Sequence, residues 1–277
     1  MGKLIITVAT TGGFQGKEAN PNLPEQPEEI AQQAYDAYNA GAAILHIHVR
    51  DKEGKPTADP TIISDVIRRV KERCNIVIQV STGVGPDSTV DERINAILTK
   101  PEMASLNMGT MVRTRWGEGS LFLNTRSQIE YYVKTMLEHG VKPEMEVYSH
   151  PMLVDVQNLI DKGLVKKPYC INFVLGMTHQ GALEAKPKNL LSLIDFLPPD
   201  SVFSVTGVGH MQTQLITLGM ILGGNVRVGM EDNVWYSKGV LASNNAQLVE
   251  RAARIAKEIG REIASPDEAR QILGLRT

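Results

Sequence analysis

The sequence predicts one (β/α)8 barrel of the α/β class, and three observations lead to this prediction. Short apolar, β-branched runs alternate with amphipathic segments of helical length along the whole chain. The alternation is repeated eight times within roughly 250 residues, the usual size of such a barrel. No Ser-rich or Gly-rich linker divides the 277 residues. A closed barrel accounts for this pattern better than a doubly wound sheet, so we expect a single domain over residues 1–277.

Eight strands are expected where apolar and β-branched residues lie between turn residues. Because each is followed by a helical segment, all eight should run parallel, with their carboxyl ends at one face of the barrel. The predicted strands are residues 4–9, 43–49, 76–81, 103–107, 144–148, 170–175, 202–206 and 225–229.

Helices are expected between the strands, and the first has a clear start. Pro27 suits a first helical turn, and Glu28 and Glu29 behind it favour the positive end of the helix dipole. The other predicted helices are residues 61–73, 90–98, 127–139, 152–162, 189–196, 211–222 and 244–261. An extra C-terminal helix over residues 266–273 begins after the cap-like Ser265 and should pack on the outside.

Two connections are longer than a barrel needs, and both follow strands. They are residues 10–26 and 109–124, and the second carries Arg113, Arg115 and Trp116. Long loops in a compact domain are usually functional, and these would lie at the catalytic face of a barrel. His179 and His210 follow the sixth and seventh strands and are second candidates for the same face.

Composition and charge exclude several classes of partner. The net charge is −2, and Lys and Arg are spread through the chain, which excludes a nucleic-acid binder. No apolar stretch approaches the ~20 residues of a membrane span, and no signal peptide precedes the first strand. Cys74 and Cys170 form no C-x-x-C pair, which fits a reducing compartment. We therefore expect a soluble cytoplasmic protein without a nucleic-acid or membrane partner.

His46 and His48 are the most informative residues of the chain. Side chains alternate along a strand, so both imidazoles point to one face, with Cα atoms roughly 6.6 Å apart. Two imidazoles at this separation can converge on one divalent ion. The alternative is a polar pocket in which the two rings are held only by hydrogen bonds.

The eighth predicted strand offers a third ligand. Alternation places Arg227, Gly229 and Glu231 on one face, and only the first strand separates this strand from the second. Two imidazoles and the Glu231 carboxylate leave a coordination position open, as in catalytic zinc sites. Zn²⁺ is therefore the first choice, although the same donors can hold Fe(II), Mn or Co. A salt bridge between Glu231 and Arg227 is the alternative.

Further polar residues collect at the strand ends. The planar guanidinium of Arg227 suits a carboxylate, and Asp232 could orient it or act as a base. Glu146 on the fifth strand is another partner for this arginine, and buried ion pairing alone would also explain the three residues. The segment containing Ser81, Thr82 and Gly83 offers hydroxyls and exposed amides to an anionic group.

Together these motifs resemble the β-keto acid cleavage enzymes over nearly the whole chain. The similarity lies in LHIHVR (45–50), QVSTG (79–83), KPEMASLN (100–107), PEMEVY (143–148), EDN (231–233), KPKNL (186–190) and NAQLV (245–249).

The resemblance implies a zinc-dependent barrel enzyme, usually a homotetramer. Such an enzyme converts a β-keto acid and acetyl-CoA into acetoacetate and a new acyl-CoA. By the family motif, the zinc ligands are His46, His48 and Glu231. The residues that hold the keto acid are Ser81, Ser105 and Asn107, and the acid/base unit is Arg227, Asp232 and Glu146. Ser81 is counted with the catalytic residues, and Thr82 and Gly83 with those that bind substrate.

One departure from the family pattern concerns the substrate. The amine-binding member has a glutamate in the loop after the first strand, where this chain has Phe14. Without that carboxylate, a primary ammonium would be buried unpaired at a cost of several kcal/mol. This disfavours 3-keto-5-aminohexanoate and favours an apolar side chain, or a quaternary ammonium bound by cation–π contact with Phe14 or Trp116. Arg113 or Arg115 could instead recognise a second carboxylate.

Two other functions fit part of the pattern. Zinc-dependent barrel hydrolases also use a His-x-His pair, but usually on the first strand and with histidines on the fifth and sixth strands. Here the pair lies on the second strand and the fifth carries Glu146. A metal-binding protein without turnover would leave Arg227 and Asp232 unexplained.

Overall fold

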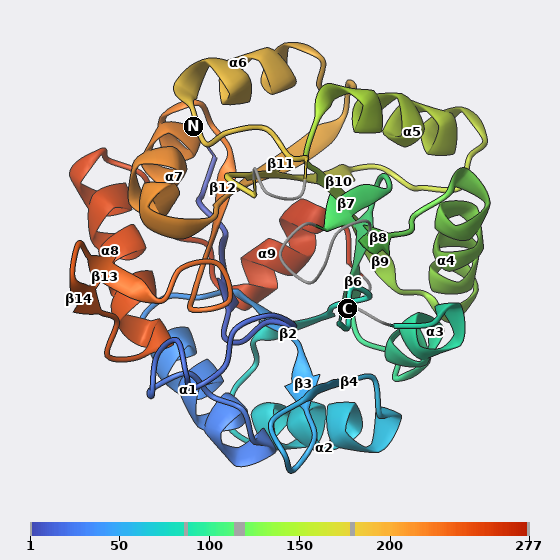
Figure 1. Ribbon diagram of the computed structural model, residues 1–277. Coiled ribbons are helices and arrows are strands. Elements are labelled where there is room, and N and C mark those ends of the chain that lie inside the picture. Colours follow the sequence, from blue (N-terminus) through green and yellow to red (C-terminus); the bar gives the residue numbers. More distant parts are fainter. Residues whose placement is uncertain (1, 86–87, 114–119, 178–180, 276–277) are drawn as a thin grey trace.

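The computed structural model describes residues 2–85, 88–113, 120–177 and 181–275, and it confirms the predicted barrel (Figure 1). Eight parallel strands form a closed ring in the order β1-β12-β11-β10-β9-β6-β5-β2, and β1 pairs with β2 to complete it. The ring consists of β1 Ile6–Ala9, β2 Ile44–Ile47, β5 Val77–Val80, β6 Met103–Asn107, β9 Lys142–Val147, β10 Tyr169–Leu175, β11 Ser201–Gly207 and β12 Asn225–Val228.

The strand register brings the polar strand ends to similar heights. His46 pairs with Ala9 on one side and with Gln79 on the other. Across the ring, Asn107 pairs with Glu146. Because parallel neighbours in register present their side chains together, these residues face one another around the barrel mouth.

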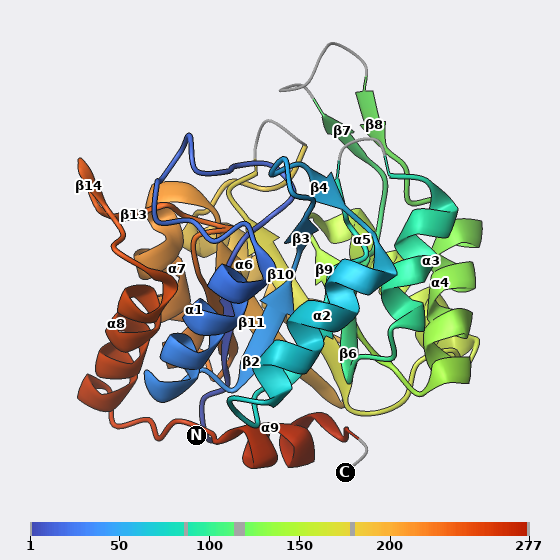
Figure 2. The same ribbon diagram turned by 90° about the horizontal axis from the view of Figure 1, so that it is seen from below.

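Helices pack around the barrel wall, as Figures 1 and 2 show. They are α1 Pro27–Asn39, α2 Pro60–Lys71, α3 Val90–Leu98, α4 Arg126–His139, α5 His150–Asp161, α6 Pro187–Asp195, α7 Gln212–Ile221 and α8 Asn245–Glu258. Thr89 and Thr125 begin α3 and α4 with capping boxes. The helix predicted to begin at residue 189 begins two residues earlier, at Pro187, because proline is accepted in the first turn of a helix. Within the described ranges, no helix has the length and apolar composition of a transmembrane span.

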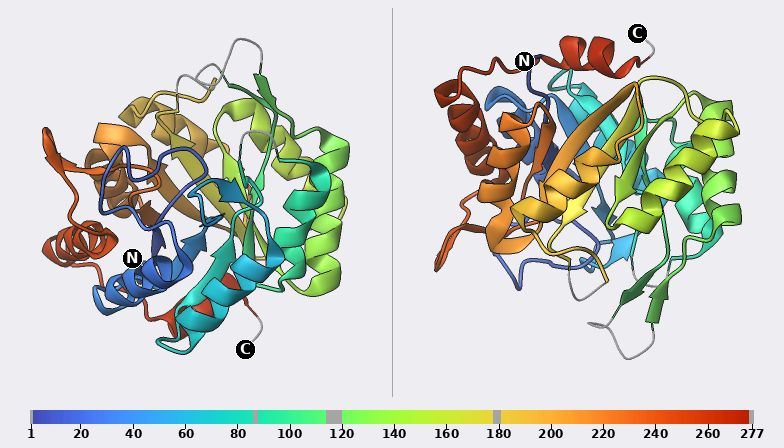
Figure 3. Two further views of the ribbon diagram at one scale, coloured as in Figure 1. Left: turned by 60° about the horizontal axis from the view of Figure 1, so that its bottom comes forward. Right: turned by 90° about the horizontal axis from the view of Figure 1, so that it is seen from above.

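The extra helix α9, Pro266–Leu273, crosses one end of the barrel instead of joining the outer ring (Figures 2 and 3). Its Ala269 and Leu273 belong to a small apolar cluster with Ile5, Val77 and Met103 near the amino ends of the strands. The helix therefore closes the bottom of the barrel, and the pocket opens at the opposite end.

Short antiparallel hairpins lie outside the barrel, and two of them differ from the predicted secondary structure. They are β3 Val49–Arg50 with β4 Pro56–Thr57, β7 Met111–Arg113 with β8 Ser120–Phe122, and β13 Trp235–Ser237 with β14 Val240–Leu241. The predicted strand 43–49 is interrupted at His48, where the chain leaves the barrel for β3. The connection 109–124, expected as a loop, contains the β7–β8 hairpin, which projects from the end opposite α9 (Figure 2).

Candidate active site

A pocket opens at the carboxyl ends of the barrel strands and is lined by most of the predicted site residues. Its polar lining is Gln15, His46, His48, Ser81, Asn107, Glu146, Tyr148, Arg227, Glu231 and Asp232. Its other lining residues are Phe14, Gly83, Met111, Phe122, Val174, Met177 and Val208. The pocket thus has a charged side near β2 and β12 and an apolar remainder.

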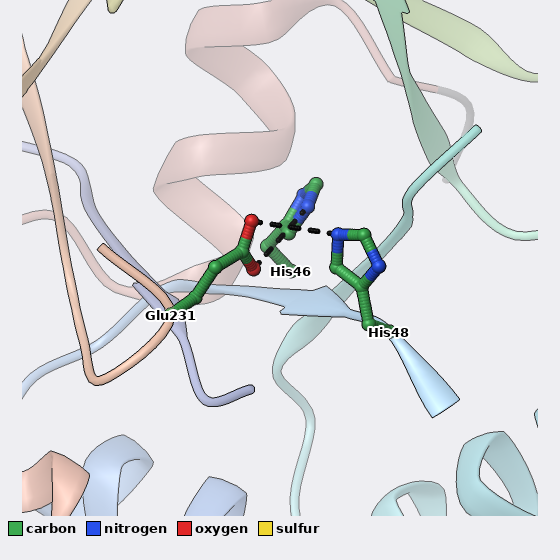
Figure 4. Close-up of side chains that lie close together, drawn as sticks. All are labelled: His46, His48 and Glu231. Carbon is green, nitrogen blue, oxygen red and sulfur yellow. Dashed lines mark ion pairs between the residues drawn. The ribbon is translucent and has the colours of Figure 1, made fainter. Parts of the chain in front are cut away.

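Both imidazoles turn toward the Glu231 carboxylate, as Figure 4 shows. Nε2 of His46 lies 3.7 Å from Oε2 of Glu231, and Nε2 of His48 lies 3.4 Å from Oε1. The ring centroids are 5.4 Å apart. His46 is on β2 and His48 follows it directly, so two successive positions of one strand face supply both rings.

Strand alternation predicts Glu231 on the same strand face as Arg227, and this is wrong, because the position of Glu231 depends on a turn after β12. β12 ends at Val228, and Gly229 then adopts φ +135°. A Cβ at Gly229 would lie 2.1 Å from the carbonyl oxygen of Ala9, so only glycine allows this close approach. Backbone hydrogen bonds from Asp232 and Asn233 to the Gly229 carbonyl close the turn. The turn brings Glu231 and Asp232 into the same pocket.

The three side chains fit a divalent metal ion. One donor atom from each lies within 4.8 Å of the others. Donors around a tetrahedral ion lie roughly 3.4 Å apart when the bonds are about 2.1 Å, close to the two separations above. Oε2 of Glu231 is buried without a hydrogen-bond partner, as expected for an atom whose partner is an ion.

The protonation state of His46 also suits a metal ligand. Burial and the nearby Arg227 lower the pKa of His46 to about 3, so the ring is neutral. Its Nδ1 is 2.7 Å from Oε1 of Gln79, which can only accept a hydrogen bond. Nδ1 therefore carries the proton, and Nε2 presents its lone pair to the pocket.

Arg227 connects the carboxylates of the site. It forms two hydrogen bonds of 2.9 Å to Asp232, one from Nε and one from Nη2. Nη2 also donates to Glu231 at 2.5 Å, and Nη1 donates to Glu146 at 3.2 Å. Burial raises the pKa of Glu231, but its polar neighbours, Arg227 foremost, together outweigh burial and hold that pKa far below its usual value. Burial raises the pKa of Asp232 to about 7, against the effect of Arg227.

Glu146 is the centre of a second hydrogen-bonded group. Its Oε2 accepts from Nδ2 of Asn107 at 2.5 Å and from the hydroxyl of Tyr148 at 3.1 Å. Tyr148 follows Glu146 by two residues and lies on the same strand face, a signal that the prediction did not use. Gln79 precedes Ser81 by two residues and was missed in the same way.

The predicted substrate segment separates into pocket residues and supporting residues. Ser81 and Gly83 line the pocket, whereas Thr82 and Ser105 are buried outside its lining. The Thr82 hydroxyl donates to the Ser105 carbonyl at 2.8 Å, and the Thr82 amide donates to the Ser105 hydroxyl at 3.3 Å. The buried Arg93 donates to the Thr82 carbonyl at 2.7 Å, which fixes the segment from behind.

The loop after β1 carries Phe14 and is anchored by Arg50. The Arg50 guanidinium donates to the carbonyls of Gly12 and Gln15 in this loop and to that of Gly54. Phe14 consequently lines the pocket, in line with the predicted location of the loop at the catalytic face.

Of the remaining candidates, His210 alone has a side chain within the described residues. His210 lies in the short helix η2, Gly209–Met211, where it is exposed and outside the pocket lining. Arg113 ends β7, and its side chain lies outside the described part of the structure. Arg115, Trp116 and His179 lie outside the described residues altogether.

A family profile described as beta-keto acid cleavage enzyme matches residues 3–275. The chain belongs to the β-keto acid cleavage enzyme family. It is therefore an enzyme that acts on β-keto acids, as the resemblance of its motifs implied. This membership also agrees with the position of the histidine pair on β2, which argued against a barrel hydrolase.

Similar proteins include family members with different substrates. A 3-keto-5-aminohexanoate cleavage enzyme of Fusobacterium nucleatum is 43% identical over 277 residues, covering 100% of this chain and 99% of that protein. A 3,5-dioxohexanoate:acetyl-CoA acetone transferase of Paraburkholderia graminis is 35% identical, covering 99% of this chain and 96% of that protein. A solved ternary complex of ObcA with a C4-CoA adduct and oxalate superposes with a TM-score of 0.81 at 20% identity, covering 92% of this chain and 68% of that one. The last likeness concerns the fold alone.

Proposed function

We propose that this β-keto acid cleavage enzyme uses acetyl-CoA and a β-keto acid with an apolar side chain. The reaction R-CO-CH2-COO⁻ + CH3-CO-SCoA → CH3-CO-CH2-COO⁻ + R-CO-SCoA balances without a further reactant. It converts the substrate into acetoacetate and a new acyl-CoA. Names of similar proteins that contain acetyl-CoA support the co-substrate.

The pairing of acidic side chains in the pocket carries the proposal for the substrate. Among described residues that line the pocket, the acidic ones are Glu146, Glu231 and Asp232, and each is ion-paired with Arg227. Together with a divalent ion on Glu231, Arg227 would balance the three carboxylates, so a primary ammonium on the substrate would find no acid left without a cationic partner. Phe14, Met177 and Val208 instead offer apolar surface to a hydrocarbon chain.

His46, His48 and Glu231 are the residues that would hold a metal ion, and we propose Zn²⁺ for its N/O donor set. When bound, such an ion would polarise substrate oxygens and stabilise enolate charge. The imidazole of His46 is presented in the tautomer that this requires, because Gln79 accepts its Nδ1 proton.

Side chains of the pocket carry out proton transfer and substrate binding. Asp232 takes a proton from the carbon between the two carbonyl groups of the substrate, and the bidentate contact with Arg227 fixes its carboxylate. Ser81, Gly83 and Asn107 line the pocket and bind substrate oxygens. Glu146, held by Asn107 and Tyr148, supports Arg227 from the other side.

The bond changes then follow from the products. The deprotonated carbon attacks the acetyl carbonyl of acetyl-CoA, which forms one C–C bond and releases the CoA thiolate. The thiolate adds to the original keto carbon, and the old C–C bond breaks. The electron pair of that bond remains on the carbon that becomes C2 of acetoacetate, where a proton completes the product. No covalent enzyme nucleophile is required.

A substrate comparison tests this proposal. The purified enzyme is incubated with acetyl-CoA and 3-oxohexanoate, 3-keto-5-aminohexanoate or 3-dehydrocarnitine, and both acetoacetate and new acyl-CoA are measured. We expect the highest kcat/KM with 3-oxohexanoate. Preference for the amino compound would overturn the substrate proposal, and acetoacetate formation without acetyl-CoA consumption would overturn the reaction.

A further inference from the structure

A buried asparagine at the start of α8 contacts the turn that carries Glu231 and Asp232. Asn245 is the first residue of α8 and is fully buried. Its Oδ1 accepts a 2.8 Å hydrogen bond from the backbone amide of Met230, the residue directly before Glu231. The segment 245–249 is one of the motifs that resemble the family, yet none of its residues lines the pocket. A side chain outside the pocket therefore holds the backbone of the turn that enters it.

The side chain of Asn245 also reaches the loop after β1. Its Nδ2 donates to the carbonyl of Thr10 at 3.1 Å. Ala9, the last residue of β1, accepts a 3.1 Å hydrogen bond from the backbone amide of Glu231. The turn and the beginning of the loop are thus joined twice, once directly and once through Asn245. These contacts fix which end of the side chain is the oxygen, because an N–H group needs an acceptor and a carbonyl needs a donor.

Gln33 on α1 holds Asn245 in this orientation. Oε1 of Gln33 accepts from Nδ2 of Asn245 at 2.6 Å and from its backbone amide at 3.0 Å. Nε2 of Gln33 donates to the carbonyl of Asn22 at 2.7 Å, so both ends of this amide have partners. The contact is possible because α1 and α8 pack side by side (Figures 1 and 2). The oxygen and both N–H groups of the Asn245 side chain are therefore paired.

Helix capping does not account for this arrangement. The N-cap of α8 is Asn244, whose Oδ1 accepts from the backbone amide of Gln247 at 2.8 Å. Asn245 instead joins three segments that lie far apart in the sequence: the loop after β1, helix α1 and the turn after β12. Leaving a buried polar group unpaired costs free energy, so a fully paired amide holds its neighbours in one arrangement.

We propose that Asn245 is a positioning residue for the metal centre: it fixes the Met230 amide next to the loop after β1, and thereby sets the position of Glu231. This inference rests on the metal site of the proposed function. The Glu231 carboxylate lies 3.4 and 3.7 Å from the two imidazoles. Metal–ligand distances in proteins stay within about 0.2 Å of their usual values, so a turn that moves away from β1 weakens the bond to Glu231.

The test measures zinc affinity by chelator competition on metal-free protein, for wild type, Asn245→Ala and Asn225→Ala. Asn225 is the matched control, because it is a buried asparagine at the amino end of β12 whose Oδ1 accepts from the backbone amide of Ile5 at 2.9 Å. Each variant leaves one buried backbone amide without its acceptor, so both should lose thermal stability.

Only the variant near the turn should change metal binding. We expect the zinc affinity of folded Asn245→Ala to fall about tenfold, as is typical when a group that supports a metal ligand is removed. The zinc affinity of Asn225→Ala should stay at the wild-type value, because a loss of overall stability does not alter the site of a protein that remains folded. Wild-type affinity in folded Asn245→Ala would overturn the inference, and so would an equal loss in Asn225→Ala.

A second pair of variants decides the question if Asn245→Ala does not fold. Gln33→Glu keeps an oxygen that accepts from Asn245, whereas Gln33→Leu removes it. Zinc affinity should stay near the wild-type value in Gln33→Glu and fall in Gln33→Leu, and equal affinities in the two variants would overturn the inference. A wild-type protein that binds no zinc would overturn the metal site of the proposed function, and this inference with it.

Discussion

Gly12 lies directly against the side chain of Glu231. A Cβ built at Gly12 would be 2.6 Å from Cγ of Glu231, closer than such atoms approach in real proteins. The carbonyl of Gly12 accepts a 2.7 Å hydrogen bond from Arg50, so the backbone at this point cannot easily retreat. The loop after β1 thus presses on the proposed metal ligand and leaves room for it only because residue 12 has no side chain.

Gly12→Ala should therefore displace Glu231 and weaken zinc binding while leaving the fold intact. We expect a lower zinc content after dialysis and a matching loss of turnover. Gly2→Ala is the control, because a Cβ at Gly2 meets no atom within 4 Å. Full zinc occupancy in Gly12→Ala would show that the close contact does not position Glu231.

Asp232→Asn should separate catalysis from metal binding. The substitution keeps the shape of the side chain but removes the proposed base, so we expect kcat to fall about 10²- to 10⁴-fold. Zinc content should stay at the wild-type level, because Asp232 is not among the proposed ligands. The measurement is acetoacetate formation beside elemental analysis, and a variant with wild-type kcat would exclude Asp232 as the base.

Phe14→Glu should change the substrate preference toward an ammonium side chain. The new carboxylate would enter the pocket without an arginine partner, since Arg227 already pairs with Glu146, Glu231 and Asp232. We expect the ratio of kcat/KM for 3-keto-5-aminohexanoate to that for 3-oxohexanoate to rise at least about tenfold, or about 1.4 kcal/mol. Phe14→Leu is the control and should keep the apolar preference. An unchanged ratio in Phe14→Glu would place the specificity elsewhere in the pocket.

The buried Glu144 predicts a pH dependence of stability. Burial raises its pKa in the folded protein from 4.5 to about 7, so between these values the folded state holds a proton that the unfolded state has lost. Stability therefore falls as pH rises through this window, by about 1.4 kcal/mol per unit and about 3 kcal/mol in all. Denaturant unfolding is measured for metal-free wild type and Glu144→Gln from pH 4.5 to 8. The free energy of unfolding of the variant should rise relative to that of wild type as the pH increases. Parallel pH profiles would contradict the raised pKa.

The barrel could be predicted from the sequence because its signal is repeated. Each strand and helix is short, but eight alternations of buried strands with amphipathic helices leave few other architectures. The placement of α9 could not be predicted, because the apolar side of Ala269 and Leu273 fits either a barrel wall or a barrel end. The β7–β8 hairpin could not be predicted, because the connection 109–124 has no regular alternation of apolar and polar residues.

The site could be predicted in part. His46, His48 and Arg227 follow from alternation and chemistry, and the structure brings them together with Glu231. The turn that places Glu231 in the pocket could not be predicted, because the conformation at Gly229 depends on its close contact with the Ala9 backbone. Gln79 was missed because it lies in the buried layer below the strand ends. The homotetramer, the cytoplasmic location and the single domain over residues 1–277 stay predictions.

The most direct test of the account is the zinc content of the purified enzyme, measured together with acetyl-CoA-dependent acetoacetate formation in wild type and His48→Ala. The account predicts zinc and turnover in wild type, loss of both in the folded His48→Ala variant, and return of wild-type activity when zinc is added back after chelation. Full turnover by metal-free wild type, or by His48→Ala, would contradict it.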